Sequence, residues 1–133
     1  MSLKSDMNNA SVGVRILDCD HREMSDALTQ LRAAVTAERD RSLTGTLLRK
    51  LGHFTQLHFA LEEGMMGATK YPETVVHRRT HQQLIRQLNA LAARHTRGGL
   101  ALSPESLSFL DAWHADHVQQ DDLHYGLWLN QAG

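Results

Sequence analysis

The sequence has few residues of the kinds that characterise several large protein classes. Its 133 positions contain one cysteine, two prolines and 5% aromatic residues. The single cysteine, Cys19, cannot form an internal disulfide, so an apolar core has to hold the fold together. A chain of this length buries roughly two-thirds of the surface that its unfolded form exposes. We therefore expect one small globular domain.

Neither charge nor hydrophobicity is concentrated in one part of the chain. The 14 basic and 15 acidic residues are scattered, whereas nucleic-acid recognition needs a concentrated positive surface. No apolar run approaches the roughly 20 residues needed to cross a bilayer, and residues 1–11 lack the apolar stretch of a secretory signal. We expect a cytoplasmic protein, a monomer or a small homo-oligomer, that binds neither nucleic acid nor membrane.

Apolar residues recur at helical spacings of three and four in four segments. The predicted helices span approximately residues 18–37, 42–66, 72–99 and 103–125. Asp18 is expected to cap the first helix, Pro72 to lie in the first turn of the third, and Ser103 to cap the fourth. No segment alternates as a strand would. The sequence predicts an all-α, antiparallel up-down-up-down four-helix bundle over residues 17–133, after an N-terminal arm at 1–16.

The second helix is predicted to face the core with six residues at this spacing. They are Leu47, Leu51, Phe54, His58, Leu61 and Met65. Gly64 and Gly67 are expected to mark the end of this helix.

Histidine is unusually abundant, with nine residues in the chain. Five of them lie within the apolar stripes of the predicted helices and not on the polar faces. These are His21, His58, His77, His81 and His117. An unpaired polar group in a dry core costs on the order of 1–3 kcal/mol, so these side chains need partners. A metal supplies one partner for all of them, because histidine is the commonest metal ligand among side chains.

The spacing of these residues supports a metal site. His58 and Glu62 are four residues apart, as are His77 and His81, so each pair projects from one face of its helix. Helix bundles build dinuclear sites from inward carboxylates and histidines on facing helices. One such pair alone is more often structural, but two pairs together with inward histidines on two further helices favour metal binding.

Five stretches of the sequence together resemble the bacterial hemerythrins over nearly the whole chain. They read DCDH at 18–21, HFALEE at 58–63, YP at 71–72, HRRTH at 77–81 and WHADHVQQDD at 113–122. The resemblance implies a hemerythrin-like bundle that holds two iron ions joined by an oxo or hydroxo bridge. The ligands implied are His77, His81 and His117 for one iron, His21 and His58 for the other, and Glu62 and Asp122 as bridges between them.

The function implied by this resemblance is reversible dioxygen binding, for transport, storage or delivery, and not catalysis. Two alternatives stay open. One is an oxygen or redox sensor that acts through a partner, and the other is a di-iron enzyme that reduces peroxide or nitric oxide.

One implied ligand does not fit a regular helix. His117 and Asp122 are five residues apart, which places them about 140° out of alignment. Asp121, at the spacing of four, would face the metal better. Because the resemblance favours Asp122, we expect either a longer carboxylate reach or a local wide turn.

Several further polar residues are predicted to lie outside the ligand set. We expect His53, His95 and His124 at the surface and His114 at the edge of the bundle, with a hydrogen bond near the cluster as the alternative for His114. Glu63 and Asp18 are expected to orient ligands or cap helices.

Overall fold

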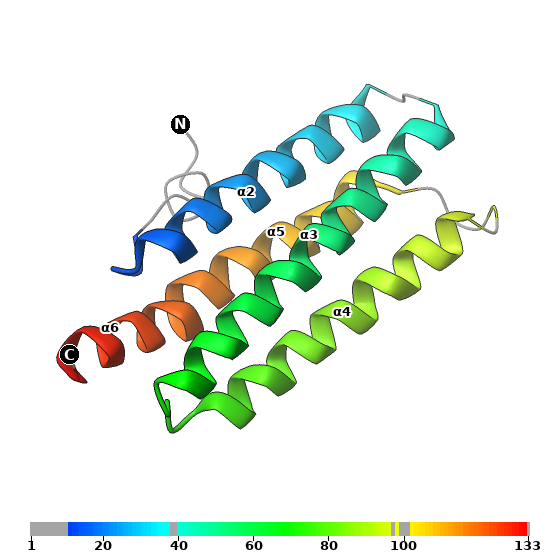
Figure 1. Ribbon diagram of the computed structural model, residues 1–133. Coiled ribbons are helices and arrows are strands. Elements are labelled where there is room, and N and C mark those ends of the chain that lie inside the picture. The colour runs from blue at the N-terminus through cyan, green and yellow to red at the C-terminus, as the bar shows by residue number, and fades with distance from the viewer. Residues whose placement is uncertain (1–10, 38–39, 97, 99–101, 133) are drawn as a thin grey trace.

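The computed structural model describes residues 11–37, 40–96, 98 and 102–132. These residues form helices and no strands. The helices are α2 (Arg15–Thr36), α3 (Arg41–Ala68), α4 (Thr74–Thr96), α5 (Pro104–Asp116), the π-helix η1 (His117–Asp122) and α6 (Leu123–Ala132). The last three follow one another without a break and form a single rod, so the described residues make four antiparallel rods (Figure 1). The predicted all-α four-helix bundle is confirmed.

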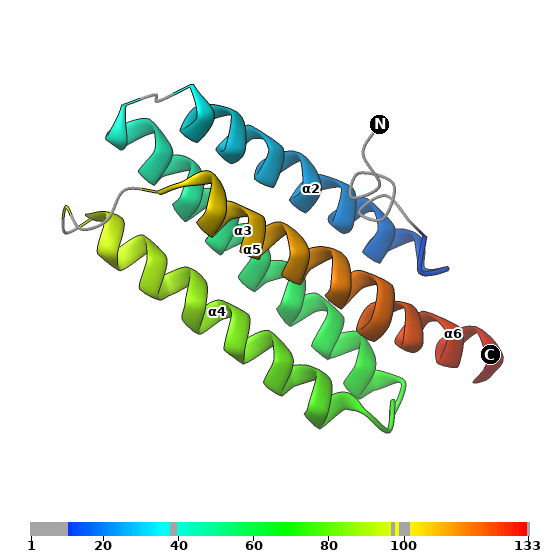
Figure 2. The same cartoon turned by 180° about the vertical axis from the view of Figure 1, so that it is seen from behind.

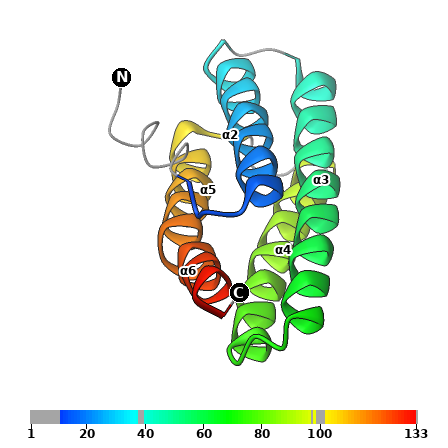
Figure 3. The ribbon, with the colours of Figure 1, turned by 60° about the vertical axis from the view of Figure 1, so that its left-hand side comes forward.

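The rods surround a common core. Figure 3 shows α2, α3, α4 and the α5–α6 rod arranged around it. In Figure 2, which views the bundle from behind, the α5–α6 rod lies in front of α3. α3 contacts both α2 and α4, and α2 also contacts α5. Within the described part of the chain, no helix is long and apolar enough to span a membrane.

The first helix begins earlier than predicted, at Arg15, and Asp18 is not its N-cap. The Asp18 carboxylate accepts hydrogen bonds from the hydroxyl of Ser11 at 2.7 Å and from the backbone N–H of Val12 at 2.8 Å. Asp18 therefore holds the preceding segment against the first turn of α2. Residues 1–10 of the expected N-terminal arm lie outside the described residues.

The second helix continues past both glycines that were expected to end it. α3 ends at Ala68, and the backbone N–H groups of Lys70 and Tyr71 bond to the carbonyls of Gly67 and Met66 at 3.2 and 2.9 Å. This is the Schellman pattern, which needs a left-handed residue and usually has glycine there. Here Lys70 takes that position with φ 59°.

The third helix begins two residues later than predicted. α4 starts at Thr74, so Pro72 lies in the connecting turn. The Thr74 hydroxyl donates to the carbonyl of Tyr71 at 2.6 Å, which closes that turn. The start of the fourth rod is as predicted: the side chains of Ser103 and Ser106 each accept a hydrogen bond from the other's backbone N–H, and proline follows Ser103.

Two apolar clusters fill the core. The Leu28 cluster consists of Leu28, Leu31, Leu48, Leu51, Phe59, Leu84, Leu88, Leu107 and Leu110. The Tyr125 cluster consists of Val12, Leu17, Met66, Tyr71, Val118 and Tyr125. Each side chain of this kind that is fully buried contributes roughly 1.5–3 kcal/mol to the free energy of unfolding. Along each rod, the inward histidines and acids lie between residues of these two clusters.

The predicted inner face of the second helix is partly wrong. Phe59 is 3% exposed and belongs to the Leu28 cluster, whereas Leu61 is 38% exposed. Phe54 and Met65 are only half-buried. Because α3 contacts helices on two sides, its buried face is wider than a single stripe and reaches Phe59 and Met66.

Candidate metal centre

All four rods contribute to one buried polar cluster. α2 supplies one side chain, and α3, α4 and η1 supply two each. They are His21, His58, Glu62, His77, His81, His117 and Asp122. None is more than 4% exposed. The structure thus brings together all seven residues that were predicted as ligands.

The five histidines divide into two groups. We call His77, His81 and His117 the three-histidine group, and His21 and His58 the two-histidine group. Together with oxygens of the two acids, each group offers one donor atom per residue, and these atoms lie within 4.8 Å of one another.

Glu62 presents one oxygen to each group. Its Oε1 atom lies 2.5 Å from Nε2 of His77 and 3.2 Å from Nε2 of His81. Its Oε2 atom lies 3.5 Å from Nε2 of His58. The carboxylate therefore spans the two groups, which is the position of a bridging ligand.

Asp122 divides its oxygens in the same way. Its Oδ1 atom lies 2.9 Å from Nε2 of His77 and 3.1 Å from Nε2 of His117, and its Oδ2 atom lies 2.8 Å from Nε2 of His21. Two carboxylates that each face both groups, together with five imidazoles, thus surround two neighbouring positions that could each hold an ion.

The π-helix explains how Asp122 reaches the cluster. In η1 the backbone bonds close over five residues instead of four, so side chains five apart share a face. His117 and Asp122 both point inward as a result, and the expected local wide turn is confirmed. Asp121 lies on the other side of the ring and accepts from Nδ1 of His117 at 2.9 Å.

The donor atoms suit metal ions better than they suit each other. Nε2 of His21, His58 and His77 and all four oxygens of the two carboxylates have no hydrogen-bond partner of acceptable geometry within the described protein, despite these short separations. These nitrogen and oxygen atoms point their lone pairs at two common positions and not at one another, which is the arrangement of metal ligands. A buried polar group without a partner costs about 1–3 kcal/mol, and a buried carboxylate costs more unless it is paired. Two cations would satisfy all of these atoms at once.

A family comparison agrees with this geometry. The model described as the hemerythrin HHE cation binding domain matches residues 12–129, a span that contains the whole cluster. The chain belongs to the hemerythrin family. The resemblance seen in the sequence is therefore confirmed.

Individual hemerythrins are similar over most of their length. Bacteriohemerythrin of Stenotrophomonas maltophilia is 28% identical over 125 residues, which cover 94% of this chain and 80% of the relative. Myohemerythrin-1 of Phascolopsis gouldii is 27% identical over 109 residues, covering 82% of this chain and 80% of the relative. A crystal structure of wild-type hemerythrin matches with a TM-score of 0.86 at 23% identity and covers 95% of each chain, which supports the fold.

Three further carboxylates orient histidines of this hemerythrin cluster. Nδ1 of His58 lies 2.8 Å from Asp20, Nδ1 of His81 lies 2.9 Å from Glu63, and Nδ1 of His117 lies 2.9 Å from Asp121. Each contact fixes a proton on Nδ1, so Nε2 is the ring atom that a cation would bind once it displaces any proton held there.

The orienting role that was expected for Glu63 is confirmed, whereas sequence reasoning missed Asp20 and misjudged Asp121. The four-residue spacing from His117 carried the signal for Asp121. No local signal identifies Asp20, because it is 38 residues away from His58.

The electrostatics of the cluster favour positive charge. Burial disfavours the charged forms of His77 and His117, but Asp122 and Glu62 outweigh it and raise the pKa values of these histidines to about 9 and about 10. Burial would raise the pKa of Asp122, but His117, His21 and His77 hold it well below its usual range. Carboxylates that hold protons on imidazoles also attract metal cations, which compete for the same atoms.

Aromatic rings cover the three-histidine group. Phe59 stacks on His81 with ring centroids 3.7 Å apart and planes within 3°, and Trp113 stacks on His117 at 4.7 Å and 20°. Phe59 belongs to the Leu28 cluster, and Val118, which follows His117 in the chain, belongs to the Tyr125 cluster. The polar centre therefore lies between apolar walls.

Two of the remaining histidines correct the sequence-based expectations. His114 is 3% exposed, and its ring lies 6.1 Å from that of His21, so it faces the inside of the bundle and not its edge. Burial, together with His21 and His117, lowers the pKa of His114 to about 3. His95 is also buried, and its Nε2 atom donates to the carbonyl of Arg41 at 2.8 Å. His53 and His124 are exposed, as predicted.

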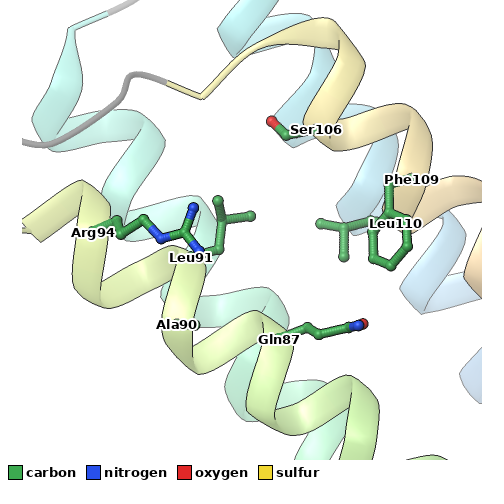
Figure 4. A pocket seen from close by; sticks show the side chains of 7 residues that line it. All are labelled: Gln87, Ala90, Leu91, Arg94, Ser106, Phe109 and Leu110. Carbon is green, nitrogen blue, oxygen red and sulfur yellow. The ribbon is translucent and has the colours of Figure 1, made fainter.

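The surface also has a groove of about 270 Å³ between α4 and α5 (Figure 4). Gln87 and Leu91 extend from α4 towards Leu110 of α5 across this gap. None of the residues that line it belongs to the polar cluster. The groove is a gap at the rim of the Leu28 cluster, and it does not open onto the metal centre.

Proposed function

We propose that this hemerythrin holds two iron ions and binds dioxygen reversibly. One observation carries the proposal: Glu62 and Asp122 each direct one oxygen to the three-histidine group and the other to the two-histidine group. Such an arrangement fits a pair of ions that share two bridges. It does not fit a single ion with four protein ligands, which is the usual structural zinc site.

The choice of iron rests on the donor chemistry and on the family. Imidazole with carboxylate suits iron, although it also accepts zinc or manganese. The two positions are unequal, because the three histidines and two shared acids give one position five donor residues, whereas the two histidines and the same acids give the other four. An external ligand therefore has more room beside His21 and His58.

The chain's own residues prepare this site for a reversible reaction. When bound, two irons would supply one electron each for the reversible reduction of dioxygen. Asp20, Glu63 and Asp121 hold three imidazole rings in place, so little rearrangement is needed when the ligand enters or leaves. Phe59 and the two apolar clusters surround the centre with apolar side chains, which disfavours protonation of bound, reduced oxygen and its irreversible release as peroxide.

The test is an oxygenation cycle on purified protein with its metal content known. We expect about two irons per chain, as in a dinuclear bundle site. After anaerobic reduction, admission of dioxygen should produce an absorption band that disappears when dioxygen is removed and returns when it is readmitted. Oxidation that is reversed only by added reductant would contradict reversible binding and would favour a redox sensor or an enzyme that reduces peroxide or nitric oxide. Stoichiometric zinc after iron-rich growth would contradict the iron assignment.

A further inference from the structure

His114 is a buried polar side chain that does not belong to the set of candidate metal ligands. It is 3% exposed, and neither of its ring nitrogens has a hydrogen-bond partner within the described protein. Buried imidazoles normally have at least one partner, since burial without one costs stability. An apolar side chain of similar size would fill the same space without that cost. The partner of His114 is therefore a group that the described part of the chain does not supply.

The position of His114 indicates what kind of group this is. The ring makes an edge contact with His21, with centroids 6.1 Å apart and planes at 73°. His21 belongs to the two-histidine group, which together with Glu62 and Asp122 offers four donor residues, one fewer than the other position. His114 thus lies on the side of the cluster where an external ligand has room.

His114 is not one of the converging donors. The atoms of His21, His58, Glu62 and Asp122 lie within 4.8 Å of one another, and no nitrogen of His114 joins them. The imidazole stands beside the site and not within it. A neutral imidazole offers one N–H donor and one acceptor, so it can bond to a small ligand next to the metals without binding a metal itself.

We propose that His114 is the hydrogen-bonding contact for a small exogenous ligand, a diatomic molecule or a small anion, bound beside His21. This inference rests on the proposed metal centre. A ligand with lone pairs on its outer atom accepts the N–H of His114 and is held more tightly than it would be against an aliphatic wall. His114 then determines which small ligands the centre prefers and how slowly they leave.

Azide binding to the oxidised iron-loaded protein tests the proposal. We compare the wild type with His114→Leu, which fills the space without a donor, with His114→Gln, which restores an N–H donor, and with His53→Leu as an exposed control. Titration gives the azide Kd, and Raman spectra in H₂O and D₂O report a hydrogen bond to the azide. Iron content is measured on each sample, so a failure of the metal centre is seen separately.

We expect His114→Leu to keep its iron and bind azide about tenfold more weakly, which is one hydrogen bond's worth of affinity. The azide vibration should lose its sensitivity to D₂O, His114→Gln should recover part of the affinity, and His53→Leu should match the wild type. An unchanged Kd and isotope shift in an iron-loaded His114→Leu variant would overturn the proposal. So would azide binding that appears only when His114 is removed, because His114 would then itself be a ligand.

Discussion

Separate replacement of Asp121 and Asp122 by alanine tests whether the π-helix decides which acid serves the metal centre. Asp122 is completely buried, and its oxygens lie 2.8, 2.9 and 3.1 Å from the Nε2 atoms of three histidines. Its removal takes a donor from both metal positions. We expect Asp122→Ala to hold about one iron per chain or less, instead of about two.

Asp121 has a smaller share in the site. Its side chain is 43% exposed, and its carboxylate lies 2.9 Å from Nδ1 of His117, on the side of that ring away from the cluster. Loss of a carboxylate that orients a ligand typically weakens metal binding 10- to 100-fold, or by about 1.4–2.7 kcal/mol. We expect Asp121→Ala to be isolated with its iron. It should then release the iron at a chelator concentration about 10- to 100-fold lower than the wild type requires.

The assay combines iron analysis after desalting, competition with a chelator, and circular dichroism to verify the fold. Asp116→Ala is the matched control, because Asp116 is an exposed aspartate on the same rod. Loss of iron in Asp121→Ala with full iron in Asp122→Ala would refute the reasoning from the wide turn. Equal loss in both variants would show that Asp121 does more than orient His117.

Three further predictions concern single residues and pH. His77→Ala should lose iron and lower the thermal midpoint relative to exposed His53→Ala; full iron content would contradict its assignment as a ligand. Lys70→Gly should raise the free energy of unfolding in urea by about 1 kcal/mol, because glycine tolerates the left-handed conformation there, and an unchanged value would argue against strain at this position. In the metal-free protein, His77 and His117 keep protons up to about pH 9 and about pH 10 when folded, but lose them near 6.5 when unfolded. Their stabilising contribution is therefore complete below pH 6.5 and is lost as pH rises through the folded-state pKa values. Two groups that each lose roughly 2 kcal/mol should lower the free energy of unfolding by about 4–5 kcal/mol between pH 7 and 9; a flat profile would contradict the charged pairs.

Local periodicity was sufficient to predict the four helices and the inward placement of the clustered histidines. His77 and His81 share a face because they are four residues apart, whatever packs against them. The same geometry identified the misfit between His117 and Asp122, so the local wide turn at η1 could be anticipated from spacing. Helical spacing is a property of the segment itself, which is why it can be read from sequence.

Features that depend on contacts between helices could not be predicted in this way. The sequence favoured Leu61 over Phe59 for the core, yet Phe59 is buried because it stacks on His81 of the neighbouring helix. Asp20 meets His58 across the interface between α2 and α3. The three-residue spacing of His114 from His117 is compatible with a place either at the edge or inside the bundle. Only the contact with His21 on another helix shows that it lies inside.

The position of the metal centre between two apolar clusters also determines how metal binding relates to folding. The Leu28 and Tyr125 clusters are built from protein side chains alone, so the bundle has a source of stability on each side of the polar centre. The carboxylates of Asp20, Glu63 and Asp121 orient imidazoles before any cation arrives. Because an unfolded chain does not hold these groups together, metal binds mainly the folded state and adds its binding free energy to the free energy of unfolding. Metal binding therefore adds stability to a bundle that the two apolar clusters already keep folded.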